Sequence, residues 1–89
     1  MAKRVHGVQS HPLREEVMLF RSMYNGVPIY TTIDGMQYEH MMGMGDPAVW
    51  TGRVGTYDVK EPEMYYEVYA PVQGTSGWVW VGNIERLEG

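Results

Sequence analysis

The chain has 89 residues, which is enough for one domain and too few for two. It contains no cysteine, so disulfides and thiolate-bound metals are excluded. The net charge is −4 and the seven lysines and arginines are scattered, which argues against a nucleic-acid partner, because such proteins carry a basic stripe. A chain this short buries only about 60–65 % of its unfolded surface, and small proteins often compensate by self-association. Self-association is therefore a first hypothesis.

Residues 1–10 predict a flexible N-terminus. The stretch 5–16 holds two histidines, a proline, an arginine and two glutamates, so it lacks the apolar centre of a secretory signal. The longest uncharged run of the chain is too mixed in composition to span a bilayer. We expect no membrane contact and a cytoplasmic location.

Residues 11–26 have two interpretations. Four apolar or aromatic side chains follow helical spacing on one face: Leu13, Val17, Phe20 and Tyr24. This pattern favours a helix, which Asn25 and Gly26 would end in a left-handed conformation. The alternative makes Asn25-Gly26 the turn of an extra hairpin between strands 17–24 and 27–33. We expect the helix, packed on the rest of the domain, because the spacing fits it better than strict alternation.

Strand signals dominate residues 27–89. Short runs rich in β-branched and aromatic residues alternate with turn residues, at 27–33, 36–42, 48–59, 64–70, 78–81 and 85–87. The longest run contains Gly52 and Gly55, and interior glycines typically mark a bulge or a bend, as a small barrel needs. Residues 82–84 predict a tight 3₁₀-like turn. The pattern is typical of a mainly β fold, a small barrel of five or six short strands.

The C-terminal part resembles the bacterial SH3-like domains. Residues 76–84, Ser-Gly-Trp-Val-Trp-Val-Gly-Asn-Ile, are similar to the Gly-Trp-Val strand, one-turn 3₁₀ element and closing strand of those domains. Residues 50–53, Trp-Thr-Gly-Arg, and the run 65–70 fit the same pattern. The resemblance covers residues 27–88 and implies an SH3-like barrel, a fold that binds peptides on aromatic grooves.

A second resemblance is to the plasmid-borne type II dihydrofolate reductases, which are also SH3-like barrels. Residues 43–46, 50–52 and 84–87 are similar to stretches of those enzymes in the same order. The enzymes are homotetramers with one central site, which uses a Val-Gln-Ile-Tyr strand. Aligned on residues 84–87, this chain has Gly-Trp-Val, residues 77–79, in place of Gln-Ile-Tyr. The resemblance therefore implies the fold and oligomerisation more than reductase chemistry. It also implies the alternative function for this chain, a small-molecule-binding protein or an enzyme with a site formed between subunits.

Alternation along the runs 65–70 and 78–81 predicts which side chains point outward. If the aliphatic side chains of both strands face the core, the outer face holds Tyr65, Glu67, Tyr69, Trp78 and Trp80. Exposed aromatic patches usually mark an interface, and Trp and Tyr are enriched at binding hot spots. Three occupants stay open for this patch: residues 11–26 of the same chain, a second copy, or an unknown protein or peptide.

No catalytic set, cofactor or metal site is predicted. The serines lack the context of an activated nucleophile, such as Gly-x-Ser-x-Gly, and residues 43–46 lack the Lys-Ser/Thr ending of a phosphate loop. Soft ligands of the kind that bind Cu(I) do occur close together in the sequence: Met36, His40, Met41, Met42 and Met44. Methionine more often fills gaps in a core. We expect a non-enzymatic binding or assembly module that is homo-oligomeric.

Overall fold

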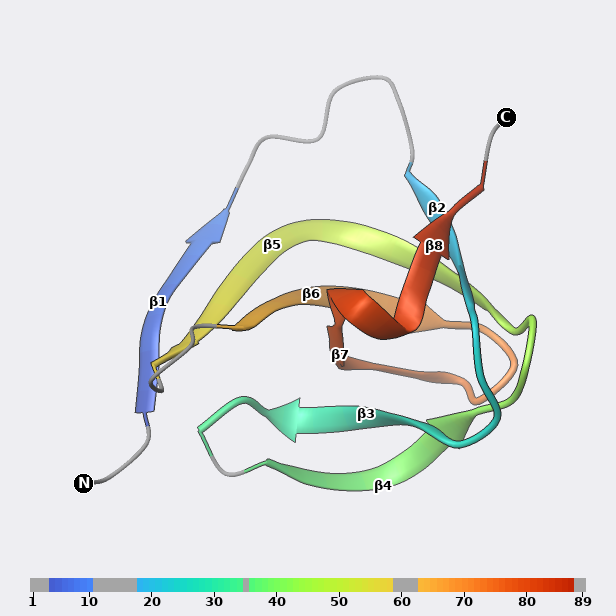
Figure 1. The fold of residues 1–89 in the computed structure, drawn as a ribbon, viewed down its shortest axis with the longest axis horizontal. Coiled ribbons are helices and arrows are strands. Elements are labelled where there is room, and N and C mark those ends of the chain that lie inside the picture. Colours follow the sequence, from blue (N-terminus) through green and yellow to red (C-terminus); the bar gives the residue numbers. More distant parts are fainter. Residues whose placement is uncertain (1–3, 11–17, 35, 59–62, 88–89) are drawn as a thin grey trace.

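The computed structural model describes residues 4–10, 18–34, 36–58 and 63–87 (Figure 1). These ranges form eight strands and one short 3₁₀ helix. In chain order the elements are β1 (Arg4–Ser10), β2 (Leu19–Ser22), β3 (Val27–Thr32), β4 (Gln37–Met42), β5 (Pro47–Asp58), β6 (Glu63–Ala70), β7 (Thr75–Trp80), η1 (Val81–Asn83) and β8 (Ile84–Arg86). The prediction of a mainly β fold is confirmed, and the 3₁₀ turn lies within one residue of its predicted place.

The strands form one antiparallel sheet in the order β4-β3-β7-β6-β5-β2-β8, and β1 pairs with β5 beside this path. The sheet curves strongly, so that β2 and β8 cross over at one side while the β3–β4 hairpin lies below β7 (Figure 1). Strands β4 and β8 stand at the two ends of the order and do not pair with each other in the described ranges. The sheet is therefore open in this structure.

Strand β5 bends in its middle. Its pairing with β6 shifts between Trp50 and Val54, so that residues 51–53 lie opposite a single residue of β6. Gly52 at the centre of this bulge has a φ of 101°, a conformation that side-chain-bearing residues rarely adopt. The bend divides β5 into a first half that pairs with β2 and a second half that pairs with β1. The bulge predicted at Gly52 is confirmed.

The helix predicted for residues 11–26 is wrong where the structure describes the segment, and residues 11–17 lie outside the described residues. Leu19–Ser22 form β2, in which buried and exposed side chains alternate strictly. The rival hairpin is also wrong in its pairing. Gly26 does make a turn, with a φ of 80°, but β2 pairs with β5 and β8 instead of β3. Pairing with distant strands outweighs the helical spacing, because it buries Phe20 in the core.

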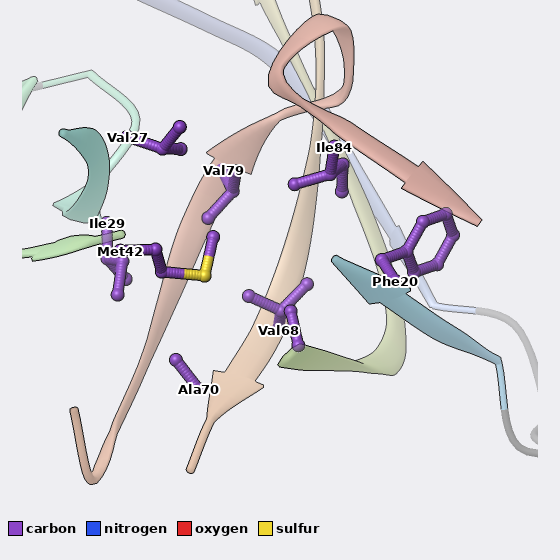
Figure 2. Packing of buried hydrophobic residues seen from close by; sticks show 9 residues of the cluster. Phe20, Val27, Ile29, Met42, Val68, Ala70, Val79 and Ile84 are labelled. Carbon is purple, nitrogen blue, oxygen red and sulfur yellow. The ribbon is translucent and has the colours of Figure 1, made fainter. Parts of the chain in front are cut away.

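The main core lies on the concave side of the curved sheet, where side chains from seven strands meet (Figure 2). Figure 2 shows the aliphatic side chains of β6 and β7 between those of the β3–β4 hairpin and those of β2 and β8. The buried members are Phe20, Val27, Ile29, Met42, Ala48, Val68, Ala70, Val79 and Ile84. This cluster holds the two edges of the sheet together without a hydrogen-bonded seam.

A second cluster lies on the opposite face of β6 and β7. Its buried members are Ile33, Tyr57, Tyr65 and Trp78, and Tyr30 and Met36 pack against them. The far end of the β3–β4 hairpin therefore covers the side of the sheet that faces away from the main core. Part of β6 and β7 is buried on both faces.

Gly77 of β7 allows β3 to approach closely. A Cβ atom at this position would lie 2.7 Å from the carbonyl oxygen of Tyr30 and 2.6 Å from Cγ2 of Ile29. The carbonyl belongs to the backbone of β3, which is fixed by its own sheet pairing. A side chain at position 77 would therefore push the two strands apart.

We predict that Gly77→Ala lowers the free energy of unfolding by about 1–3 kcal/mol, the usual cost of overpacking a closed core. Urea unfolding followed by Trp fluorescence measures the effect. Ser76→Ala is the control, because the neighbouring Ser76 side chain is exposed. Equal stability of the two variants would contradict the close approach of β3 and β7.

Candidate functional site

The five side chains predicted to form one exposed patch lie on one face of β6 and β7 but are not equally accessible. The register aligns Tyr65 with Trp80 and Glu67 with Trp78, which places these four on the same side of the sheet. Tyr69 and Trp80 are 44 % and 37 % exposed, whereas Tyr65 and Trp78 are only 3 % and 7 % exposed. The expectation that Tyr65 and Trp78 belong to an exposed surface is therefore wrong.

The β3–β4 hairpin is the reason for this difference. Ile33, at the end of β3, packs into the second cluster, and Gly55 leaves room for it, since a Cβ at that position would lie 2.2 Å from Ile33 Cδ1. The Tyr30 ring stands 6.1 Å from the Tyr65 ring, centroid to centroid. Burial raises the pKa of Tyr65, and Glu63, which accepts a hydrogen bond from its hydroxyl, adds to the shift. These phenols and the indole of Trp78 are structural.

A polar group separates the two exposed aromatic side chains. The guanidinium of Arg53 lies 5.5 Å from the centroid of the Trp78 ring and 3.3 Å from the carboxylate of Glu67. The Thr51 hydroxyl also donates a hydrogen bond of 2.9 Å to Glu67. The Glu67 carboxylate thus accepts hydrogen bonds from two side chains of the same chain, Thr51 and Arg53.

Tyr69 belongs to a different exposed surface, which continues across the sheet. Tyr69 of β6 pairs with Val49 of β5, and Val49 pairs with Leu19 of β2. The N–H of Leu87, just after β8, donates a hydrogen bond of 2.8 Å to the carbonyl of Leu19. These four apolar or aromatic residues form a line across four strands, which we call the outer row: Leu87, Leu19, Val49 and Tyr69. Val49 is half-buried and the other three are exposed.

The residues beside the outer row carry charges that are already paired. Arg21 and Glu85 occupy the next outward positions on β2 and β8 and form an ion pair with each other. On the other side, Arg53 and Glu67 form the ion pair described above. The outer row is therefore an apolar line between two neutralised pairs.

A shallow hollow of about 430 Å³ borders the Arg21–Glu85 pair. It lies against the turn that follows β2 and the turn that precedes β5. Its lining residues are Arg21, Ser22, Met23, Tyr24, Met44, Gly45 and Glu85. Tyr24 and Met44 expose apolar surface to it, whereas the Ser22 hydroxyl is buried and donates a hydrogen bond of 2.7 Å to the Tyr24 carbonyl.

A polar clamp fixes the turns near this hollow. The Asp46 carboxylate accepts hydrogen bonds from the backbone N–H of Gly43, at 2.8 Å, and from the side-chain amide of Gln73, at 2.9 Å. Gln73 also donates to the carbonyl of Met41, and the Asn25 side chain accepts from the N–H of Met44. Three turns are joined in this way. The hydrogen bond from Gln73, and to a smaller extent the one from Gly43, holds the pKa of Asp46 below its usual value.

The outer row was missed at the level of sequence, apart from Tyr69. Leu19 fell within the expected helix, and Leu87 fell in a three-residue strand too short to show alternation. The pairing of β2 with β5 and β8, which aligns these residues, joins parts of the chain more than 25 positions apart. No local signal marks β2, because Leu19-Phe20-Arg21-Ser22 reads apolar, apolar, polar, polar, whereas the alternation is seen only in the burial of its side chains.

The soft ligands between residues 36 and 44 do not form one group. Met42 is fully buried in the main core, Met36 packs against the second cluster, and Met41 and Met44 are exposed. Among the residues that the structure describes, no three His, Asp or Glu side chains gather in a way that could hold a metal ion. Within the same ranges, no helix has the length and hydropathy needed to cross a membrane.

Comparison with known proteins gives no relative for this chain: no family model matches it, and neither a curated protein nor a solved structure does.

The two tryptophans of β7 should differ sharply on truncation. We predict that Trp78→Ala costs about 3–5 kcal/mol of unfolding free energy, because it removes a buried ring. Trp80→Ala should cost less than about 1 kcal/mol, since its ring is partly exposed and rests against Gly82. Urea unfolding monitored by far-UV circular dichroism compares them. Similar losses in both variants would show that the burial is assigned wrongly.

Asp46 should make stability depend on pH. Its pKa is lower in the folded chain than in the unfolded one, so its stabilising effect is complete above the ordinary value near 3.8 and declines as the pH falls through the lowered value. We predict that Asp46→Ala destabilises the protein at pH 7 and that the difference from the natural chain shrinks below about pH 4. Thermal unfolding from pH 2.5 to pH 7 measures it. A difference independent of pH would contradict the clamp.

Proposed function

We propose that this protein is a non-enzymatic binding or assembly module that contacts another protein through the outer row. The observation that carries the proposal is the exposure of Leu19, Tyr69 and Leu87 in line with Val49 across four strands. Contiguous apolar surface on a soluble domain usually marks a contact site. The row offers no acid, base or nucleophile apart from the phenol of Tyr69, so binding of a partner fits this surface better than catalysis does.

The surroundings of the row support the same proposal. An interface typically has an apolar centre and a polar rim. Here the centre is the row, and the rim is formed by the Arg21–Glu85 and Arg53–Glu67 pairs. Ion pairs of this kind lose little hydration when a partner displaces water from the centre, because they remain at the solvated edge. The arrangement suits burial of a flat, apolar partner surface.

We further propose that the fold is an SH3-like barrel in an open form. Support comes from the succession β7, η1 and β8, followed by the pairing of β8 with β2 and of β2 with the bent β5. In a small barrel the interior positions are filled by core side chains, so the convex side is the one that stays accessible to a partner. The outer row lies on that convex side, opposite Phe20, Ala48 and Val68.

We predict that Tyr69→Glu reduces the surface's affinity for apolar groups and leaves the fold intact. The change should alter unfolding free energy by no more than about 0.5 kcal/mol, as for other exposed positions. It should lower the fluorescence of the apolar dye 8-anilinonaphthalene-1-sulfonate on the native protein by about half, because the row would be its principal site. Leu19→Glu should behave in the same way.

Tyr38→Glu is the matched control. Tyr38 is a tyrosine of similar exposure, 47 %, on the distant edge strand β4, and its substitution changes the net charge by the same amount. Dye binding should survive this change. If the dye signal follows Tyr38 instead of Tyr69, or if Tyr69→Glu unfolds the protein, the outer row is not a contact surface.

A further inference from the structure

We propose that Asn25-Gly26 is a site of spontaneous covalent modification, the deamidation of Asn25, and that the polar clamp around it decides when the reaction runs. An asparagine followed by glycine is open to this reaction, because glycine has no side chain to shield or restrict its backbone nitrogen. The other asparagine of the chain, Asn83, is followed by the β-branched Ile84. Asn83 therefore serves as an internal comparison of low reactivity.

The reaction needs only water and groups of the chain itself. The backbone nitrogen of Gly26 loses its proton and bonds to Cγ of Asn25, the bond from Cγ to the side-chain nitrogen breaks, and ammonia leaves. Water then opens the resulting cyclic imide at either of its carbonyl carbons. The products are aspartate and isoaspartate, whose backbone runs through the former side chain and is one carbon longer. The net change is the uptake of water and the loss of ammonia, and nothing is oxidised or reduced.

Both reacting groups are engaged in the folded structure. The N–H of Gly26 donates a hydrogen bond of 2.9 Å to the carbonyl of Met42, and Oδ1 of Asn25 accepts one of 2.9 Å from the N–H of Met44. The first bond holds the proton that has to leave, and the second ties the carboxamide to the turn after β4. Closing the imide ring requires the nitrogen and Cγ to approach each other freely. Asn25 is exposed to water, so these hydrogen bonds, and not burial, protect it.

The turn that holds Asn25 is itself held from another turn. Figure 1 shows the β2–β3, β4–β5 and β6–β7 turns gathered at the same end of the sheet. Gln73, between β6 and β7, donates to the Asp46 carboxylate, which also accepts the N–H of Gly43 beside Met44. Gln73 therefore restrains Asn25 from a separate part of the chain, through the β4–β5 turn. Local opening is fast compared with deamidation, so the reaction rate follows the fraction of time that the clamp is open.

The products do not fit the closed clamp. Isoaspartate adds a carbon to the backbone of the turn in which Gly26 bonds to Met42. Aspartate brings a second carboxylate close to that of Asp46. Oδ1 of Asn25 and Oδ2 of Asp46 lie 3.6 Å and 3.5 Å from the point where a Cβ of Gly43 would stand, and like charges at such a separation repel. Deamidation thus makes a transient opening of the clamp permanent.

The test is the rate of deamidation at each asparagine of the natural full-length chain at neutral pH, measured by peptide-resolved mass spectrometry. Asn25 should react at least about tenfold more slowly in the folded chain than in urea, because it reacts only through local opening. Gln73→Ala should raise the rate in the folded chain at least about threefold, through the loss of its hydrogen bonds to the clamp. Asn83 should stay unmodified in both folded chains.

Gly77→Ala is the matched control, because it destabilises the whole fold at a site outside the clamp. It should leave the rate at Asn25 within about twofold of the natural chain, under conditions in which both variants are fully folded by circular dichroism. The deamidated natural chain, separated by ion exchange, should unfold at a lower urea concentration than the unmodified chain.

Each other outcome overturns a defined part of the inference. An Asn25 that does not react in urea would remove the site itself, and equal rates in the folded and unfolded chains would remove its protection by the fold. If Gly77→Ala accelerates the reaction as much as Gln73→Ala does, the reaction runs through global unfolding and the clamp does not control it. A deamidated chain of unchanged stability would show that the clamp closes over the product.

Discussion

The bend of β5 at Gly52 is the constraint on which the rest of the structure depends. Strands β1 and β2 both pair with the same side of β5, and β6 occupies the other side. A straight twelve-residue strand would hold β1 and β2 in one flat layer. The left-handed backbone at Gly52, open to glycine and costly for other residues, turns the first half of β5 away from the second. Strand β2 then carries β8 over the concave side, and Phe20 and Ile84 reach the core (Figure 2).

The second consequence of this curvature is that β6 and β7 are covered on both faces. An antiparallel sheet usually buries one face and leaves the other to solvent. Here Val68 and Val79 fill the concave core, while Tyr65 and Trp78 are covered from the convex side by the end of the β3–β4 hairpin. The aromatic side chains of this face therefore divide into a structural part and an exposed part, with Arg53 and Glu67 between them.

The features of this fold that the sequence predicts are those that depend on local interactions. The positions of β3 to β8, the bulge at Gly52 and the shared face of residues 65, 67 and 69 depend on neighbours in the chain, and alternation together with glycine placement predicts them. Residues 4–10, expected to belong to a flexible N-terminus, instead form β1 and pair with β5. The burial of Trp78 depends on Ile33, more than forty positions away, and no pattern within β6 or β7 reports it. The same holds for β2. The spacing of Phe20 and Tyr24 fits a helix, and only the edges offered by β5 and β8 make the strand more favourable.

The outer row stands out because it departs from the residue choice at the neighbouring outward positions of β2 and β8. One step along β2 and β8 the outward positions carry Arg21 and Glu85, the polar choice expected for a solvated face. Leu19 of β2 and Leu87, just after β8, are leucines on the side away from the core that Phe20 fills. Folding gains little from leucine at such positions, since their side chains stay in water. Local rules are broken most often where a surface has a use beyond folding, and these leucines, aligned with Val49 and Tyr69, are where this chain breaks them.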